Sequence, residues 1–182
     1  MIFVADIMEF SRRDDQAQLA LRRVLFPLVA HAFDGAGLPW RLRLHEDRGD
    51  GVLVVVPVPV SIEPVVRGLV RRLVRGLAEH NRSADPPDRM RLRAALHTGI
   101  VHRDRYGVAG TPVNHTFRLV DAPSIRDALT ASAADLAFAL SETAYGDLTV
   151  PSLPGFRAAL AEVKRTSAPI WIWTGRPVDA LL

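Results

Sequence analysis

The strongest constraint on the fold lies in the run from His45 to Pro57, HEDRGDGVLVVVP, where a polar segment meets a short apolar strand. Asp50-Gly51 separates two strand-like runs. Such a pair predicts a β-hairpin, because a tight primed turn needs positive φ, which glycine adopts freely. Asp50 is therefore expected at the hairpin tip, exposed and held rigidly. It is either a turn residue only or a carboxylate that serves a binding site.

A second aspartate, Asp6, lies within the apolar opening segment MIFVADIM. Burying an unpaired carboxylate there costs on the order of several kcal/mol, so Asp6 is expected to have a cationic partner. That partner is either a core arginine or a metal ion. Together with Asp50 on another strand, Asp6 forms a candidate metal-binding pair, in which we include the neighbouring Ile7.

The segment after Asp6 is expected to begin a helix. Ser11 followed by Asp14 resembles a capping box and predicts a helix over residues 12–33. Backbone N–H groups at the start of a helix lack partners and attract anions. Phe10 and Ser11 are therefore expected to border a metal-bound polyphosphate.

Hydrophobic periodicity and turn residues predict the remaining elements. Further helices are expected over 61–81, from Pro112 onward and over 133–140, and Pro27 predicts a kink or an early break in the first helix. Strands are expected over 2–8, 40–46, 52–56, 90–99, 106–109, 128–131, 156–163 and 170–174. This irregular alternation indicates an α+β sandwich with a mainly antiparallel sheet and helices on one side.

Composition narrows the class of protein. The chain has 182 residues, enough for one domain over 1–182, and it contains no cysteine, which excludes disulfides and thiolate metal sites. No apolar run approaches the roughly 20 residues of a membrane helix, and the first strand leaves no room for a leader, so a cytoplasmic protein is expected. Arg71, Arg72 and Arg75 lie on one predicted helix without aromatic neighbours to stack bases, so nucleic-acid binding is not expected.

Four motifs in order resemble the class III nucleotidyl cyclase catalytic domain: ADIMEFS, EDRGDGVL, LHTGIVH and GTPVNHTFRL. A late EVK with a closing aromatic strand completes the series, which spans nearly the whole chain. The resemblance implies the ferredoxin-like, palm-type sandwich of that family.

The resemblance also implies roles for individual residues. In that family two aspartates bind two divalent cations, Mg²⁺ or Mn²⁺, and these correspond to Asp6 and Asp50. One cation lowers the pKa of the ribose 3′-hydroxyl and the other neutralises the triphosphate. The transition-state asparagine and arginine correspond to Asn114 and Arg118. The base-selecting position is Glu46, which suggests guanine.

Three features depart from the family pattern. The second base-selecting position is Gly107, which offers no side chain. The hairpin after the fourth strand, which helps the family dimerise, is short. The late lysine motif is reduced, so that Lys164 or Arg165 is expected to bind the triphosphate.

The implied function is a nucleotidyl cyclase, a phosphorus–oxygen lyase that converts a nucleoside triphosphate into a 3′,5′-cyclic nucleotide and pyrophosphate. The implied assembly is a homodimer, because each site of the family takes its aspartates from one chain and its asparagine and arginine from the other. A protein regulator is left open. Two alternatives remain: a cyclase-like domain without turnover that senses nucleotides or binds a protein, and a pyrimidine cyclase that signals in phage defence.

Overall fold

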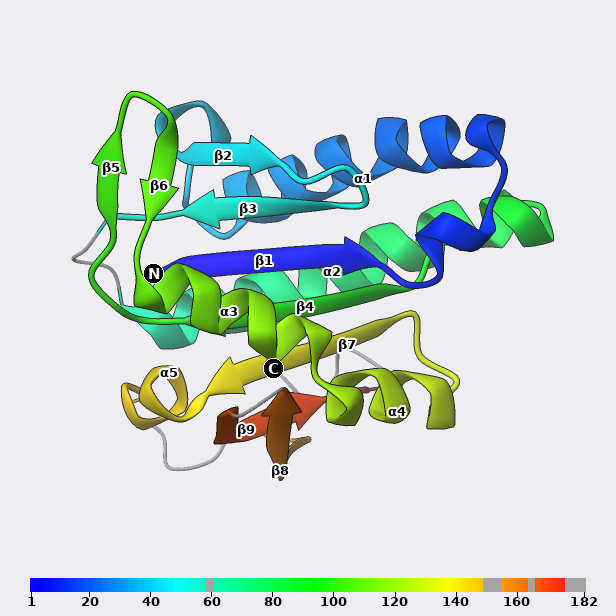
Figure 1. Ribbon diagram of the computed structural model, residues 1–182. Coiled ribbons are helices and arrows are strands. Elements are labelled where there is room, and N and C mark those ends of the chain that lie inside the picture. The colour runs from blue at the N-terminus through cyan, green and yellow to red at the C-terminus, as the bar shows by residue number, and fades with distance from the viewer. Residues whose placement is uncertain (58–60, 149–154, 164–165, 176–182) are drawn as a thin grey trace.

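The computed structural model describes residues 1–57, 61–148, 155–163 and 166–175. Its centre is a seven-stranded sheet (Figure 1) in the order β2-β3-β1-β4-β7-β9-β8. Neighbouring strands are antiparallel except for β4 and β7, which are parallel. The bounds are β1 Ile2–Ile7, β2 Leu44–Asp47, β3 Gly51–Val55, β4 Leu92–His97, β7 Leu136–Ser141, β8 Phe156–Val163 and β9 Thr166–Trp173. The expected α+β fold with a mainly antiparallel sheet is confirmed.

Helices cover both faces of this sheet, not one face as expected. Because successive side chains of a strand point to opposite faces, the apolar strand β1 feeds two cores. Phe3 lies in the core with α1 (Asp15–Gly35) and α2 (Ile62–Ser83). Val4 lies in the core with α3 (Thr111–Asp121) and α4 (Pro123–Ala131). Figure 1 shows α3 and α4 in front of the sheet and α1 and α2 behind it.

Short elements complete the described chain. They are the 3-10 turns η1 Phe10–Arg12, η2 Trp40–Leu42 and η3 Pro86–Asp88, the helix α5 Glu142–Gly146, and a separate hairpin of β5 His102–Asp104 and β6 Gly107–Ala109. No helix among the residues described is long and apolar enough to cross a bilayer.

Two sequence predictions are reversed in the second half of the chain. The strand expected over 128–131 is the end of α4, and the helix expected over 133–140 is largely replaced by β7. Every residue of β7 is buried between β4 and β9. A strand buried on both faces reads as a continuous apolar run, which periodicity cannot distinguish from a buried helix.

The first helix begins later than expected. Its N-cap is Asp14, whose side chain accepts a hydrogen bond of 2.8 Å from the Ala17 N–H, while Ser11 lies in η1. The helix continues past Pro27 to Gly35. The strand expected over 40–46 is likewise divided into η2 and β2.

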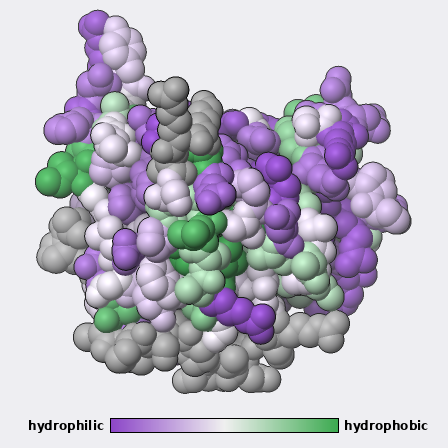
Figure 2. Space-filling view, turned by 60° about the horizontal axis from the view of Figure 1, so that its bottom comes forward, coloured by the Kyte–Doolittle hydropathy of each residue, from purple (hydrophilic) through white to green (hydrophobic). Residues whose placement is uncertain are grey.

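Figure 2 shows one face of the molecule, mostly hydrophilic, with a compact apolar patch near its centre. Among the described residues, the large apolar side chains that stay exposed are Leu19, Ile100, Tyr106 and Leu160. Ile100 and Tyr106 are each 80% exposed; Ile100 precedes β5, and Tyr106 lies in the turn between β5 and β6.

Candidate active site

The hairpin between β2 and β3 places Asp50 beside the end of β1. The Ile7 N–H donates a hydrogen bond of 2.9 Å to the Asp50 carbonyl oxygen, which joins the loop to the strand that carries Asp6. The turn differs from the expected one, because the residue with positive φ is Gly49 (+83°), and Gly51 is already part of β3. Gly51 is needed for close approach instead, since a Cβ there would meet the Ala5 carbonyl oxygen at 2.3 Å.

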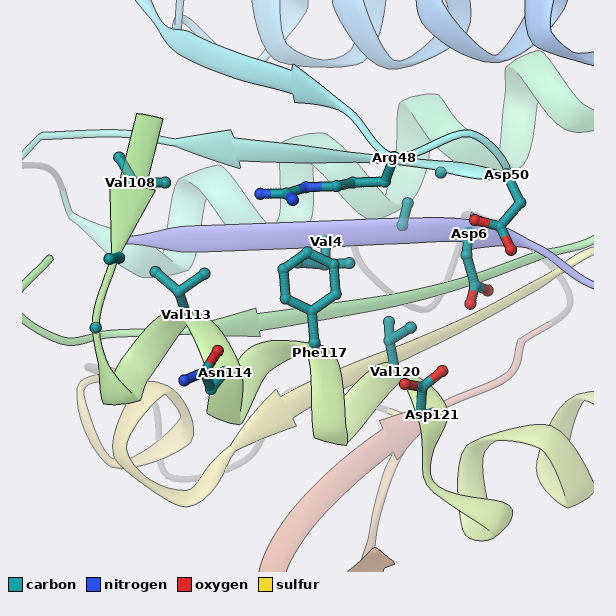
Figure 3. Close-up of a pocket in the computed structure, with 14 residues that line it drawn as sticks. Val4, Asp6, Arg48, Asp50, Val108, Val113, Asn114, Phe117, Val120 and Asp121 are labelled. Carbon is teal, nitrogen blue, oxygen red and sulfur yellow. The ribbon is translucent and has the colours of Figure 1, made fainter. Parts of the chain in front are cut away.

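A cavity of about 610 Å³ lies between this hairpin, β1, β6 and α3. Its lining includes Asp6, Arg48, Asp50, Asn114, Phe117 and Asp121. Figure 3 shows the carboxylates of Asp6, Asp50 and Asp121 at one end and Asn114 at the other. The fold therefore brings both predicted aspartates and the predicted asparagine to one cavity. Asp121 was not expected there.

Asp6 is buried, with 8% of its surface exposed, and is paired with Arg93 on the adjacent strand β4. Arg93 Nε donates to Oδ1 at 2.9 Å and Nη2 donates to Oδ2 at 2.6 Å. Burial raises the pKa of Asp6 to about 7; Arg93 opposes that rise, and the charges of Asp50 and Asp121 add to it. Arg93 is thus the core arginine expected as one of the two possible partners of Asp6.

A divalent cation fits the donor chemistry of this end of the cavity. Mg²⁺ prefers oxygen ligands and is commonly held by one or two carboxylates together with substrate phosphates. Asp6 and Asp50 can supply those carboxylates, but Arg93 engages both oxygens of Asp6 and would have to release at least one. Within the described part of the chain, no three His, Cys, Asp or Glu side chains are gathered as a ready-made metal site. Metal binding at Asp6 therefore competes with the ion pair.

The two expected base-selecting positions lie next to each other. The Val108 N–H donates to Glu46 Oε1 at 3.1 Å, and the Arg48 guanidinium forms an ion pair with Oε2. A Cβ on Gly107 would stand 2.5 Å from Glu46 Oε1, and Gly107 has a φ of +132°. The absence of a side chain at position 107 thus makes room for the Glu46 carboxylate.

Asn114 and Arg118 are exposed on α3 at i and i+4. Asn114 lines the cavity, whereas Arg118 is not among the lining residues. Burial lowers the pKa of the neighbouring His115, and the charge of Arg118 lowers it further. The His115 ring stands edge-on to that of His97, with 4.8 Å between ring centroids.

Of the four residues expected to bind phosphate, the structure describes Phe10 and Ser11. Phe10 packs against the core with α1 and α2, and Ser11 is exposed. Neither begins α1, because Asp14 caps the first turn of that helix. Lys164 and Arg165 lie outside the described residues.

A contact that the sequence did not predict joins the hairpin to α1. Arg22 on α1 donates to Asp47 Oδ1 at 2.9 Å and also contacts the Gly49 carbonyl oxygen. Asp47 Oδ1 in turn accepts a hydrogen bond of 2.8 Å from the Gly49 N–H. A lone arginine on a polar helix face gives no signal of such a role, because its partners are 25 and 27 residues away.

Solved nucleotidyl cyclase catalytic domains superpose on nearly the whole length of this chain, which therefore has the class III cyclase fold. No protein-family model and no curated protein matches the sequence. An adenylate/guanylate cyclase/hydrolase from Silicibacter pomeroyi superposes with a TM-score of 0.69 at 18% identity, over 97% of this chain and 96% of that one. The guanylyl cyclase Cya2 gives 0.63 at 18% identity, over 98% and 93%. The adenylyl cyclase CyaB from P. aeruginosa gives 0.60 at 14%, over 97% and 93%.

Proposed function

We propose that the protein is a nucleotidyl cyclase that converts a nucleoside triphosphate into a 3′,5′-cyclic nucleotide and pyrophosphate. One observation carries the proposal: in a chain with the class III cyclase fold, Asp6 on β1 and Asp50 in the β2–β3 hairpin line the same end of one cavity (Figure 3).

The reaction needs no protein nucleophile, so the side chains act by positioning and by charge. The ribose 3′-oxygen attacks the α-phosphorus, the bond from that phosphorus to the bridging oxygen breaks, and pyrophosphate leaves with the electron pair. The hydroxyl proton passes to solvent. Bound divalent cations would supply charge neutralisation and acidify the 3′-hydroxyl. Asp6 and Asp50 would hold them, Asn114 would orient the ribose, and Arg118 would stabilise charge that develops on the α-phosphoryl group.

The ion pair between Asp6 and Arg93 would have to open when a cation binds Asp6. One buried amino group of Arg93, Nη1, has no hydrogen-bond partner within the residues the structure describes. A metal-bound triphosphate would offer that guanidinium anionic oxygens in exchange for the carboxylate. Binding of metal and substrate together is therefore expected to be stronger than binding of metal alone.

A homodimer fits the distribution of these residues. Arg118 is exposed on α3 and does not line the cavity of its own chain, which suits a role in the site of a second copy. Ile100 and Tyr106, each 80% exposed beside the β5–β6 hairpin, offer apolar surface for such an interface. Analytical ultracentrifugation of Tyr106→Ser should then show weaker dimerisation, with activity per chain that recovers at high protein concentration.

The direct test is incubation of the purified protein with ATP, GTP, CTP or UTP and Mn²⁺, with products identified by mass spectrometry. A cyclic product is expected from at least one triphosphate. Asp50→Asn should lower its rate by about 100-fold or more, because a preorganised electrostatic group is lost. Asp127→Asn, an exposed carboxylate on α4, is the matched control and should retain the rate. Equal rates for the protein and Asp50→Asn would rule out the mechanism.

A second candidate is a nucleotide-binding module without turnover. The ion pair between Asp6 and Arg93 favours it, because both carboxylate oxygens are occupied by a guanidinium. This alternative predicts that calorimetry detects nucleotide binding while no cyclic product forms from any of the four triphosphates.

A further inference from the structure

The end of the cavity away from the carboxylates has its own donors and acceptors. Figure 3 shows the Arg48 side chain extending from the hairpin away from Asp50, toward Val108 and over Phe117. Asn114 lies at the same end. In the proposed function, Asn114 holds the ribose, so the base of that nucleotide lies near Arg48 of the chain that supplies Asn114.

Glu46, the expected base reader, already has partners for both oxygens. Oε1 accepts from the Val108 N–H at 3.1 Å, and Oε2 is paired with Arg48. Its side chain is 23% exposed, whereas that of Arg48 is 37% exposed. The group that faces a ligand at this end of the cavity is therefore the Arg48 guanidinium rather than the Glu46 carboxylate.

Two contacts hold the Arg48 guanidinium in a fixed orientation toward the cavity. Its Nη2 is bonded to Glu46, and its Cζ lies 5.2 Å from the centre of the Phe117 ring. Among the residues the structure describes, Glu46 is the hydrogen-bonding partner of this guanidinium, so Nε and Nη1 remain for a ligand. A guanidinium only donates hydrogen bonds, and its fork suits two adjacent acceptors.

We propose that Arg48 is a specificity-determining residue that selects guanine by donating to O6 and N7 of the base. Guanine presents these two acceptors side by side, and a bidentate arginine is the commonest specific contact to them. Adenine has an amino group at the same place as O6, which would meet the guanidinium as a second donor. Glu46 acts as a positioning residue, because it holds Arg48 in place. This inference rests on the proposed function for the orientation of the nucleotide.

Two guanine analogues separate Arg48 from Glu46 as the reader. ITP keeps O6 and N7 but lacks the exocyclic N2 amino group, whereas 7-deaza-GTP lacks N7. With Arg48 as the reader, kcat/KM for ITP should lie within about threefold of that for GTP. The value for 7-deaza-GTP should fall about 10-fold and that for ATP about 10- to 100-fold, because hydrogen bonds to charged groups are strong.

Arg48→Met retains an unbranched apolar chain against Phe117 but removes every donor. It should bring GTP, 7-deaza-GTP and ATP to within about threefold of one another, mainly by lowering kcat/KM for GTP. Arg48→Lys keeps the charge without the fork and should also lose the preference for GTP over 7-deaza-GTP. Arg75→Met is the matched control, because Arg75 is likewise paired with one glutamate, Glu79, but lies on α2.

Three results would overturn the inference. The first is a loss of 10-fold or more with ITP, which would identify a carboxylate reading N2. The second is an unchanged ratio of kcat/KM for GTP to that for ATP in Arg48→Met.

The third result concerns binding. If no triphosphate yields a cyclic product, the proposed function fails, and the same preferences are then measured as ratios of Kd by calorimetry. A preference for GTP and ITP over 7-deaza-GTP and ATP in binding would support Arg48 even so, and equal or undetectable binding of all four would exclude it.

Discussion

Replacing Arg93 should show how much its buried ion pair with Asp6 contributes to the free energy of unfolding. The two side chains are each 11% exposed and share hydrogen bonds of 2.9 and 2.6 Å. Arg93→Met fills similar space but leaves the Asp6 carboxylate buried without its cation. Deleting one partner of such a pair typically costs about 3–5 kcal/mol, a large share of the total stability of a domain.

The size of this loss should depend on pH in a defined direction. Arg93 opposes the rise that burial imposes on the pKa of Asp6, so its removal raises the folded-state pKa further. A carboxyl group whose pKa is raised by folding contributes most favourably at low pH, and that contribution is lost as pH rises through the folded pKa. Arg93→Met should therefore lose more stability at pH 8 than at pH 5.5, where Asp6 takes up a proton.

Urea unfolding at both pH values measures this difference. Arg75→Met, which breaks an exposed ion pair with Glu79, is the control and should cost less than about 1 kcal/mol at either pH. Asp6→Asn combined with Arg93→Met should recover part of the loss at pH 8, because no buried charge remains. A loss in Arg93→Met below about 1 kcal/mol, or one equal at pH 5.5 and pH 8, would refute the reasoning.

Three further predictions concern the groups around the cavity. Gly107→Ala places a Cβ 2.5 Å from Glu46 Oε1 at a φ of +132° and should lower the free energy of unfolding by about 1–3 kcal/mol; an unchanged urea midpoint would contradict this. Arg22→Met releases the hairpin from α1 and should weaken Mn²⁺ binding in calorimetry while changing stability by less than about 1 kcal/mol, since its pair with Asp47 is exposed. Burial lowers the pKa of His97 to about 4, so stability should be full above about pH 6.5, fall as pH drops toward 4, and fall less in His97→Asn.

Much of the fold could be predicted from local pattern. The hairpin after Glu46, the helix from Thr111 and the strand over 156–163 all lie where turn residues and periodicity place them. The prediction failed at β7, where burial on both faces removes the periodicity. It also failed at the turn, where Gly49 rather than Gly51 takes the positive φ.

The candidate site could be predicted in part. Asp6, Asp50 and Asn114 were recognised from their positions in motifs, and the structure places all three on one cavity. Arg48 and Arg93 could not be recognised in the same way. In a chain with 22 arginines, no local sequence pattern distinguishes an arginine that belongs to a site from an arginine elsewhere on the surface.

By itself the sequence determined that Asp6 needs a cationic partner, because an aspartate inside an apolar strand is unstable alone. Only the tertiary structure decided that the partner is Arg93, 87 residues further along the chain. Likewise, the Asp-Gly pair by itself predicted a turn, but only the close approach of strand β1 explains why position 51 must be glycine. The reason is common to both cases: propensities and turns act over a few residues, whereas ion pairs and close approaches depend on which strands become neighbours in the sheet.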